Sequence, residues 1–197
     1  MLGSTSPRRR ELIASLDVPF VIAPIDVDEG KREGETPSAY LERVVAAKLA
    51  SALAVRASLS AQAGGLGGVL VADTIVVGPD GALLGKPGSD VESREMIARL
   101  EGASHEVRTR FALASEDAGA DDSVAQTVTT RVVFRRLTPL EIDAYVASGE
   151  GRDKAGAYAV QGRAAAFVEG IVGSYTNVVG LPLCEVVVAM RRLGWLP

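Results

Sequence analysis

An acidic residue interrupts one of the most apolar stretches of the sequence. The run from residue 69 to residue 77 consists of Val, Leu, Ala and Ile apart from Asp73 and Thr74, which is typical of a central strand covered on both faces. A carboxylate buried there without partners is costly, so Asp73 requires an explanation. At the end of a strand it could hold a hard cation or accept a proton from water. The alternative is structural, with Asp73 capping a bulge or pairing with Lys48 or Lys86.

Hydroxyl and guanidinium groups cluster at the start of the first predicted helix. Ser6 and Pro7 form the pattern of an N-cap followed by the first helical residue. The first turn then holds three consecutive cations, although the positive end of the helix dipole disfavours them there: Arg8, Arg9 and Arg10. Together with Ser4 and Thr5, this segment offers the donors that suit a phosphate chain. The alternative is a solvated basic face.

Four more polar residues could serve the same chemistry. Glu29 lies on a charged loop and could supply a second oxygen ligand, because Mg²⁺ is usually held by one or two carboxylates and by substrate phosphates. Lys86 lies on a Gly/Pro turn and could approach a phosphate, whereas Lys48 lies on the polar stripe of a predicted helix, where most lysines are solvated. Gln161 carries the donors and acceptors that read a nucleobase edge, although a glutamine satisfied within a strand is the default interpretation.

The composition excludes several other classes of protein. The 197 residues carry a net charge of −4 and only 5% aromatic side chains, so we expect no nucleic-acid partner. One cysteine, Cys184, and one histidine, His105, exclude an internal disulfide and a histidine-rich metal site. We expect His105 in a turn and Cys184 in the core of the last helix. No apolar run approaches the roughly 18 residues of a membrane span, and the start resembles no signal peptide, so we expect a cytoplasmic protein without a membrane partner.

Strands alternate with helices along the chain, which favours an α/β fold in one domain over residues 1–197 with two lobes. N-cap and proline signals, and Ser/Thr-x-x-Glu capping boxes, predict helices at residues 7–16, 37–59, 90–100, 139–149 and 182–193. Residue patterns predict strands at 18–25, 69–77, 107–114 and 126–135, with short strand material in 156–167. An acidic loop, 115–125, joins two of these strands, and the glycine-rich segment 61–68 is expected to be a flexible connector.

Taken together, the motifs resemble the Maf family of nucleoside triphosphate pyrophosphatases. They follow the family order along nearly the whole chain: Leu2-Gly-Ser-Thr-Ser-Pro-Arg-Arg-Arg-Glu-Leu12, Ala72-Asp-Thr74, Gly85-Lys-Pro87, Ser104-His105, Asp153-Lys-Ala-Gly156, Gln161-Gly162 and Gly173-Ser-Tyr-Thr-Asn-Val-Val-Gly-Leu-Pro182. The resemblance implies a central mixed sheet flanked by helices, and two lobes with an active-site cleft, similar to the inosine triphosphate pyrophosphatases. It also implies a cytoplasmic enzyme that uses Mg²⁺ or Mn²⁺ to cleave a nucleoside triphosphate into the monophosphate and pyrophosphate.

The resemblance also assigns roles to individual residues. Asp73 matches the family's catalytic proton acceptor, and with Glu29 it is expected to hold the metal; whether Asp73 is base, ligand or both stays open. The expected substrate-binding residues are Ser4, Ser6, Arg8, Arg9, Lys48, Thr74, Lys86 and Gln161. Among these, Arg8, Thr74 and Gln161 resemble the set associated with dTTP and UTP, whereas relatives acting on 7-methyl-GTP resemble a Ser-Pro-Tyr-Arg-Arg form. The glycine-rich insert at 64–68 departs from the family pattern and should only lengthen a surface loop.

These motifs predict hydrolysis of dTTP and UTP, which could remove non-standard nucleotides. Two alternatives remain open at this point. One is a nucleotide-binding regulator of cell division or septum formation with little turnover, and the other is the same chemistry on another base such as 7-methyl-GTP. The sequence does not fix the oligomeric state, and a homodimer is one option.

Overall fold

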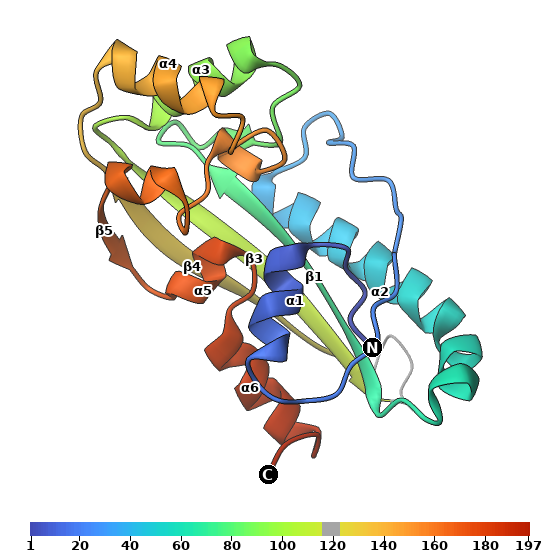
Figure 1. The fold of residues 1–197 in the computed structure, drawn as a ribbon. Coiled ribbons are helices and arrows are strands. Elements are labelled where there is room, and N and C mark those ends of the chain that lie inside the picture. The colour runs from blue at the N-terminus through green and yellow to red at the C-terminus, as the bar shows by residue number, and fades with distance from the viewer. Residues whose placement is uncertain (116–122) are drawn as a thin grey trace. The chain divides into compact units, whose positions relative to one another are not determined.

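A computed structural model describes residues 1–115 and 123–197 of the chain (Figure 1). The chain divides into two compact units, each built from separate segments. Unit 1 comprises Met1–Asp73, Thr109–Val128 and Gly180–Pro197, and unit 2 comprises Thr74–Arg108 and Thr129–Val179. In chain order the elements are α1 (Pro7–Ala14), α2 (Pro37–Ala63), β1 (Gly68–Val77), β2 (Leu83–Leu84), α3 (Asp90–Leu100), β3 (Ser104–Ser115), β4 (Val124–Phe134), α4 (Pro139–Ala147), the 3₁₀ helices η1 (Ala155–Ala157) and η2 (Arg163–Phe167), β5 (Val168–Val172), α5 (Tyr175–Val179) and α6 (Leu183–Arg192).

The five strands form one sheet in the order β2-β1-β3-β4-β5, which confirms the α/β class. The outer pairs, β1 with β2 and β4 with β5, are antiparallel. Leu2 adds parallel bridges to Leu70 of β1 and to Ile22, so both strand directions occur. Gly3 lies so close to β1 that an added Cβ would come within 2.8 Å of the Val71 side chain. The extended start of the chain therefore requires a glycine at this position.

Alternation along the strands divides the core of unit 1 into two clusters. Val69 and Val71 of β1 pack in a cluster that includes Val45, Leu49 and Ala52 of α2. The intervening Leu70 and Ala72 pack in a second cluster with side chains of α1 and α6: Ile13, Val186, Ala189 and Met190. Because strand side chains alternate between faces with a period of two, β1 separates α2 from α1 and α6.

Unit 2 has its own core around Phe134 of β4. Phe134 makes edge-to-face ring contacts with Tyr158 and Phe167, at centroid distances of 4.9 and 6.0 Å. Buried side chains from α3, α4 and β2 complete this cluster: Leu84, Met96, Ile97, Leu100, Ile142 and Tyr145. An exposed ion pair between Arg94 and Asp143 joins α3 to α4 on the outer side. The aromatic side chains of this core thus stabilise unit 2 from within.

The capping signals predicted the helix starts well. Ser6 accepts a hydrogen bond from the amide of Arg9 and Pro7 is the first helical residue of α1, as expected. Thr138 forms a full capping box with Glu141 at the start of α4. At α3 the box is incomplete: Ser89 accepts from the amide of Glu92, but the Glu92 carboxylate accepts from Gly88. Helix ends were predicted less well, because α2 continues to Ala63 before Gly64 ends it in the left-handed conformation.

Several expectations were wrong. Residues 18–25 form no strand apart from the single bridge at Ile22, and 156–167 contain η1 and η2 rather than strand material. His105 is not in a turn but buried in β3, where Nε2 lies 2.8 Å from the hydroxyl of Tyr158. Cys184 is exposed rather than in the core. These residues depend on long-range packing that local patterns do not reveal. The expected loop 115–125 lies largely outside the described residues.

By length and composition, α2 is apolar enough to cross a membrane, since residues 37–62 contain an 18-residue window of mean hydropathy 1.4. This is weak evidence for a span. A long helix was expected at 37–59, but an apolar stretch of about 18 residues was not. Its buried residues Val45, Leu49 and Ala52 belong to the core of unit 1, and its buried Lys48 forms two ion pairs. Packing within unit 1 therefore explains the apolar side of α2.

Candidate active site

A buried lysine joins two carboxylates in unit 1. The Nζ atom of Lys48 lies 2.7 Å from Oδ1 of Asp73 and 2.6 Å from Oε1 of Glu29. Asp73 and Lys48 are both nearly inaccessible to solvent, whereas Glu29 is partly exposed. The pairing with Lys48 was the structural alternative for Asp73, and it compensates the burial of this carboxylate. The expectation of a solvated Lys48 is wrong.

The positions of Asp73 on β1 and Lys48 on α2 explain why the two side chains lie on facing surfaces. Asp73 follows Val69 and Val71 at alternate positions of β1, so it lies on the face that packs against α2. Lys48 precedes Leu49 of α2, which packs in that same cluster. The strand parity predicts the face of β1 on which Asp73 lies, but not that α2 packs on that face. Thr74, the next residue of β1, points to the opposite face and begins the part of the strand that belongs to unit 2.

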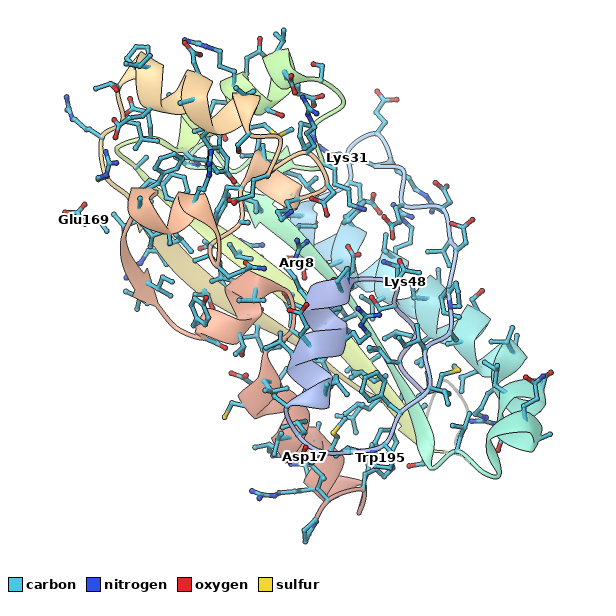
Figure 2. The ribbon with its side chains drawn as sticks, in the orientation of Figure 1. Arg8, Asp17, Lys31, Lys48, Glu169 and Trp195 are labelled. Atoms are coloured by element: carbon cyan, nitrogen blue, oxygen red, sulfur yellow. The ribbon has the colours of Figure 1, made fainter. Side chains whose placement is uncertain are left out.

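The start of α1 is held by a second buried cation. Arg9 donates from Nε to the carbonyl of Gly180 at 2.8 Å and from Nη1 to the hydroxyl of Ser4 at 3.4 Å. Ser4 also accepts from the amide of Ser6, the N-cap residue. A solvated basic face is therefore wrong for Arg9, although Arg10 is exposed and Arg8 is half-buried. Figure 2 shows Arg8 at the start of α1 and Lys48 on α2.

Electrostatic interactions connect the Asp73–Lys48–Glu29 group with Arg9 at the start of α1. Burial lowers the pKa of Arg9, while the charges of Asp73 and Glu29 oppose this shift and that of Arg8 adds to it. Burial, together with the negative charges of Asp73 and Glu29, raises the pKa of Tyr40 to about 12. Arg9 and Lys48 thus both interact with the two carboxylates, and a third cation, Arg8, interacts with Arg9. An excess of positive charge suits a polyanionic ligand that arrives with a metal ion.

The sequence reasoning missed two residues of α2 that hold the loop of Glu29. The hydroxyl of Tyr40 donates to the carbonyl of Glu29 at 3.0 Å. The guanidinium group of Arg43 donates to the carbonyls of Asp28 and Gly30. On α2, Arg43 follows Tyr40 by three residues and Lys48 follows it by eight. This spacing could have suggested that the three side chains share a role.

The remaining predicted residues belong to unit 2. Lys86 is exposed in the segment after β2, whose Gly85 carbonyl accepts from the amide of Gly156. Gln161 is also exposed, in the turn between η1 and η2. This turn is fixed by Glu150, whose carboxylate accepts from the amide of Arg163. Gln161 is therefore not satisfied within a strand, which was the default interpretation.

The carboxylates fit a hard divalent cation in part. Within the described ranges 1–115 and 123–197, no group of three or more His, Cys, Asp or Glu side chains could hold a metal ion. Asp73 and Glu29 supply two hard oxygen donors, and a positive group, the ammonium of Lys48, already lies between them. Such a pair of carboxylates suits Mg²⁺ or Mn²⁺ when substrate phosphates and water complete the coordination.

Comparison with known proteins decides the family. The model of the family described as Maf-like protein matches residues 1–193. The chain belongs to the Maf family. Its relatives extend over nearly its whole length, and the chain likewise covers at least nine-tenths of each of the three relatives described next.

These Maf relatives carry a common name. The chain is 45% identical over 194 residues to a dTTP/UTP pyrophosphatase of Geotalea uraniireducens, which covers 98% of this chain and 94% of the relative. It is 46% identical over 196 residues to one of Geobacter sulfurreducens, with 100% and 97% covered. It is 47% identical over 186 residues to one of Moorella thermoacetica, with 94% and 90% covered.

Proposed function

We propose that this Maf protein hydrolyses dTTP and UTP to the nucleoside monophosphate and pyrophosphate. The observation that carries the proposal is the Asp73–Lys48–Glu29 cluster, in which Asp73 and Lys48 are buried and whose carboxylates act on Arg9 at the start of α1. Full-length relatives named dTTP/UTP pyrophosphatase support the choice of reaction and substrate. The names of these full-length relatives also favour an enzyme over a nucleotide-binding regulator without turnover.

In the proposed reaction, water attacks the α-phosphorus, the bond from this phosphorus to the bridging oxygen breaks, and pyrophosphate leaves with the electron pair. Asp73 accepts the proton of the attacking water, while the contact with Lys48 orients its carboxylate. The donors at the start of α1, from Ser4 to Arg9, bind the phosphate chain. Positive charge near the leaving pyrophosphate is where electrostatic stabilisation has the greatest effect.

A divalent cation is part of the proposal, with Asp73 and Glu29 as the residues that would hold it. When bound, Mg²⁺ or Mn²⁺ would neutralise charge on the phosphates and on the leaving group. The roles of Lys86 with phosphate, and of Thr74 and Gln161 with the base, rest on the motif resemblance. We also propose a cytoplasmic enzyme whose partner is its nucleotide substrate.

A turnover panel tests the proposed function. Purified protein is incubated with dTTP, UTP, CTP, GTP and 7-methyl-GTP in the presence of Mg²⁺ or Mn²⁺, and monophosphate and pyrophosphate are resolved. We expect dTTP and UTP to be cleaved to these two products. Binding of nucleotide without products would favour the regulator, and a preference for 7-methyl-GTP would move the activity to another base.

A substitution of Gln161 tests the base preference separately. Uracil and thymine present two acceptors around a ring N–H donor, a pattern that a glutamine amide can meet, whereas cytosine reverses part of it. A site built for this pattern can reject a mismatched base by up to about 10⁴-fold. We expect Gln161→Leu to lower kcat/KM for UTP much more than that for CTP. Equal cleavage of UTP, CTP and GTP by the unmodified protein would remove the assignment of Gln161 but not the pyrophosphatase activity.

A further inference from the structure

Three consecutive backbone carbonyls on the loop before α2 accept hydrogen bonds from side chains of that helix. The carbonyl of Asp28 accepts from Nη1 of Arg43 at 3.2 Å, and that of Gly30 accepts from Nη2 at 2.8 Å. The carbonyl of Glu29 between them accepts from the hydroxyl of Tyr40 at 3.0 Å. The backbone on both sides of Glu29 is therefore attached to one turn of α2.

Arg43 is itself held in place. Its Nε and Nη2 atoms lie 2.6 and 2.9 Å from the two carboxylate oxygens of Glu35, which is the bidentate geometry of a strong ion pair. Glu35 in turn accepts from the amide of Arg32, on the same loop. The guanidinium carbon also lies 5.5 Å from the ring centroid of Tyr40. All three donor nitrogens of Arg43 are thus used, and a lysine, with a single nitrogen, could not make these bonds together.

This arrangement matters because Glu29 lies on an irregular segment of the chain. The segment from 23 to 32 contains no helix or strand, and the carboxylate of Glu29 is 42% exposed. Ordering an exposed glutamate on an irregular loop costs conformational entropy each time a ligand binds. A loop that is already ordered avoids this cost, so the donors on α2 keep the Glu29 carboxylate near Lys48 before any ligand arrives.

We propose that Arg43 is a positioning residue that holds Glu29 in the place where its carboxylate takes part in binding the divalent cation. This inference rests on the proposed function, in which Glu29 is one of the two carboxylates for the metal. Arg43 touches neither phosphate nor metal in this proposal. It acts through the carbonyls of Asp28 and Gly30, as residues behind metal ligands commonly do.

The test compares Arg43→Gln and Arg43→Lys with the unmodified protein. Arg56→Gln is the matched control, because Arg56 lies on the same helix and donates to the carbonyl of Ser115, far along the chain from the loop of Glu29. Two quantities are measured: the Mn²⁺ concentration that half-saturates UTP turnover, and Mn²⁺ affinity by electron paramagnetic resonance with α,β-methylene-UTP bound. The second readout requires no turnover.

We expect Arg43→Gln to weaken Mn²⁺ binding by about 10-fold or more in both measurements, the scale of losses behind metal ligands. Arg43→Lys should restore only part of the affinity, and Arg56→Gln should leave it unchanged. In a Glu29→Gln background, Arg43→Gln should have no further effect on Mn²⁺ affinity, because both substitutions remove the same interaction.

Two results would overturn the proposal. One is a lower melting temperature in Arg43→Gln with unchanged Mn²⁺ affinity, which would make Arg43 only a stabilising residue of the loop. The other is a full additional loss of affinity in the Glu29→Gln background, which would show that Arg43 does not act through Glu29. If no nucleotide is cleaved by the unmodified protein, the proposed function fails, while the paramagnetic resonance titration still decides whether Arg43 acts through Glu29.

Discussion

At the scale of single residues, the lysine between two carboxylates is the most informative feature. Asp73 was predicted from the sequence because a charge in an apolar strand is unusual, and its burial is observed. Lys48 was placed in the site by family resemblance, whereas its residue pattern favoured a solvated side chain. The reason is that a polar stripe on a helix looks the same whether it faces solvent or another charged group. Only the contact with Asp73, 25 residues away in the sequence, shows that Lys48 faces a charged group rather than solvent.

We predict that Asp73→Asn lowers kcat for UTP by about 10²-fold or more while the fold is retained. The amide keeps the shape of the carboxylate and its oxygen can still accept from Lys48, but it can neither take a proton from water nor supply the charge for a cation. Turnover is measured as pyrophosphate released, and the fold is checked by circular dichroism and thermal unfolding.

A matched control for this substitution is Asp143→Asn. Asp143 forms an exposed ion pair with Arg94 in unit 2, and such pairs contribute little to stability. This variant should keep the activity and melting temperature of the unmodified protein. Near-normal kcat in Asp73→Asn would remove Asp73 from the mechanism.

At the scale of elements, local signals predicted where helices begin, and tertiary packing decided the rest. The hydroxyl caps at Ser6, Thr36 and Thr138 are read from neighbouring residues alone, and all three accept backbone hydrogen bonds as expected of N-caps. The segment 156–167 instead folds as 3₁₀ turns because its apolar side chains pack against α4 and β4. Apolar runs of this length do not distinguish strand from turn.

The turn that carries Gln161 is held at both ends by α4 and the residues just after it. The hydroxyl of Tyr145 accepts from the amide of Ala159 at 3.1 Å and donates to the carboxylate of Glu150 at 3.1 Å. The other oxygen of Glu150 accepts from the amide of Arg163. These bonds fix the backbone two residues before and two residues after Gln161.

We therefore predict that Tyr145→Phe reduces the preference for UTP over CTP. The ring can remain against Phe167, where the centroids lie 5.1 Å apart, but the buried amide of Ala159 loses its acceptor. The free energy of unfolding should fall by about 1–3 kcal/mol, the typical cost of an unsatisfied buried group. Urea unfolding measures this loss, and kcat/KM for the two nucleotides measures the preference. An unchanged UTP/CTP ratio in a variant that has lost this stability would show that the turn does not set base preference.

At the scale of the whole molecule, each unit is assembled from segments that are distant in the sequence. Leu2 bridges to Leu70 and the carbonyl of Gly180 meets Arg9, although no local pattern relates these residues. The alternation of strands and helices predicted the α/β class, and two lobes were expected, but which segments form each unit is decided by the pairing of distant segments. The same is true of His105, whose neighbours are about 30 and 50 residues away.

His105, the single histidine of the chain, is enclosed in the core of unit 2. Its ring makes edge-to-face contacts with Phe134 and Tyr158, at centroid distances of 5.0 and 5.4 Å. Nε2 lies 2.8 Å from the hydroxyl of Tyr158, while Nδ1 has no hydrogen-bond partner among the described residues. Protonation would place a second N–H donor in this apolar surrounding, so burial lowers the pKa of His105 from 6.5 to about 4.

We predict that this histidine makes the protein less stable as the pH falls from about 7 to about 4. In that interval the unfolded chain binds a proton that the folded protein does not, so the free energy of unfolding decreases with falling pH. A pKa difference of about 2.5, from 6.5 to about 4, corresponds to a loss of about 3 kcal/mol once the pH is below both values. The single imidazole signal in proton NMR measures the folded pKa directly, and urea unfolding between pH 7.5 and 4.5 measures the loss. His105→Phe should make the decrease over this interval smaller by most of that amount, whatever its effect at pH 7.5. An imidazole signal that titrates near pH 6.5 in the folded protein would contradict the prediction, because the folded and unfolded states would then bind the proton equally well.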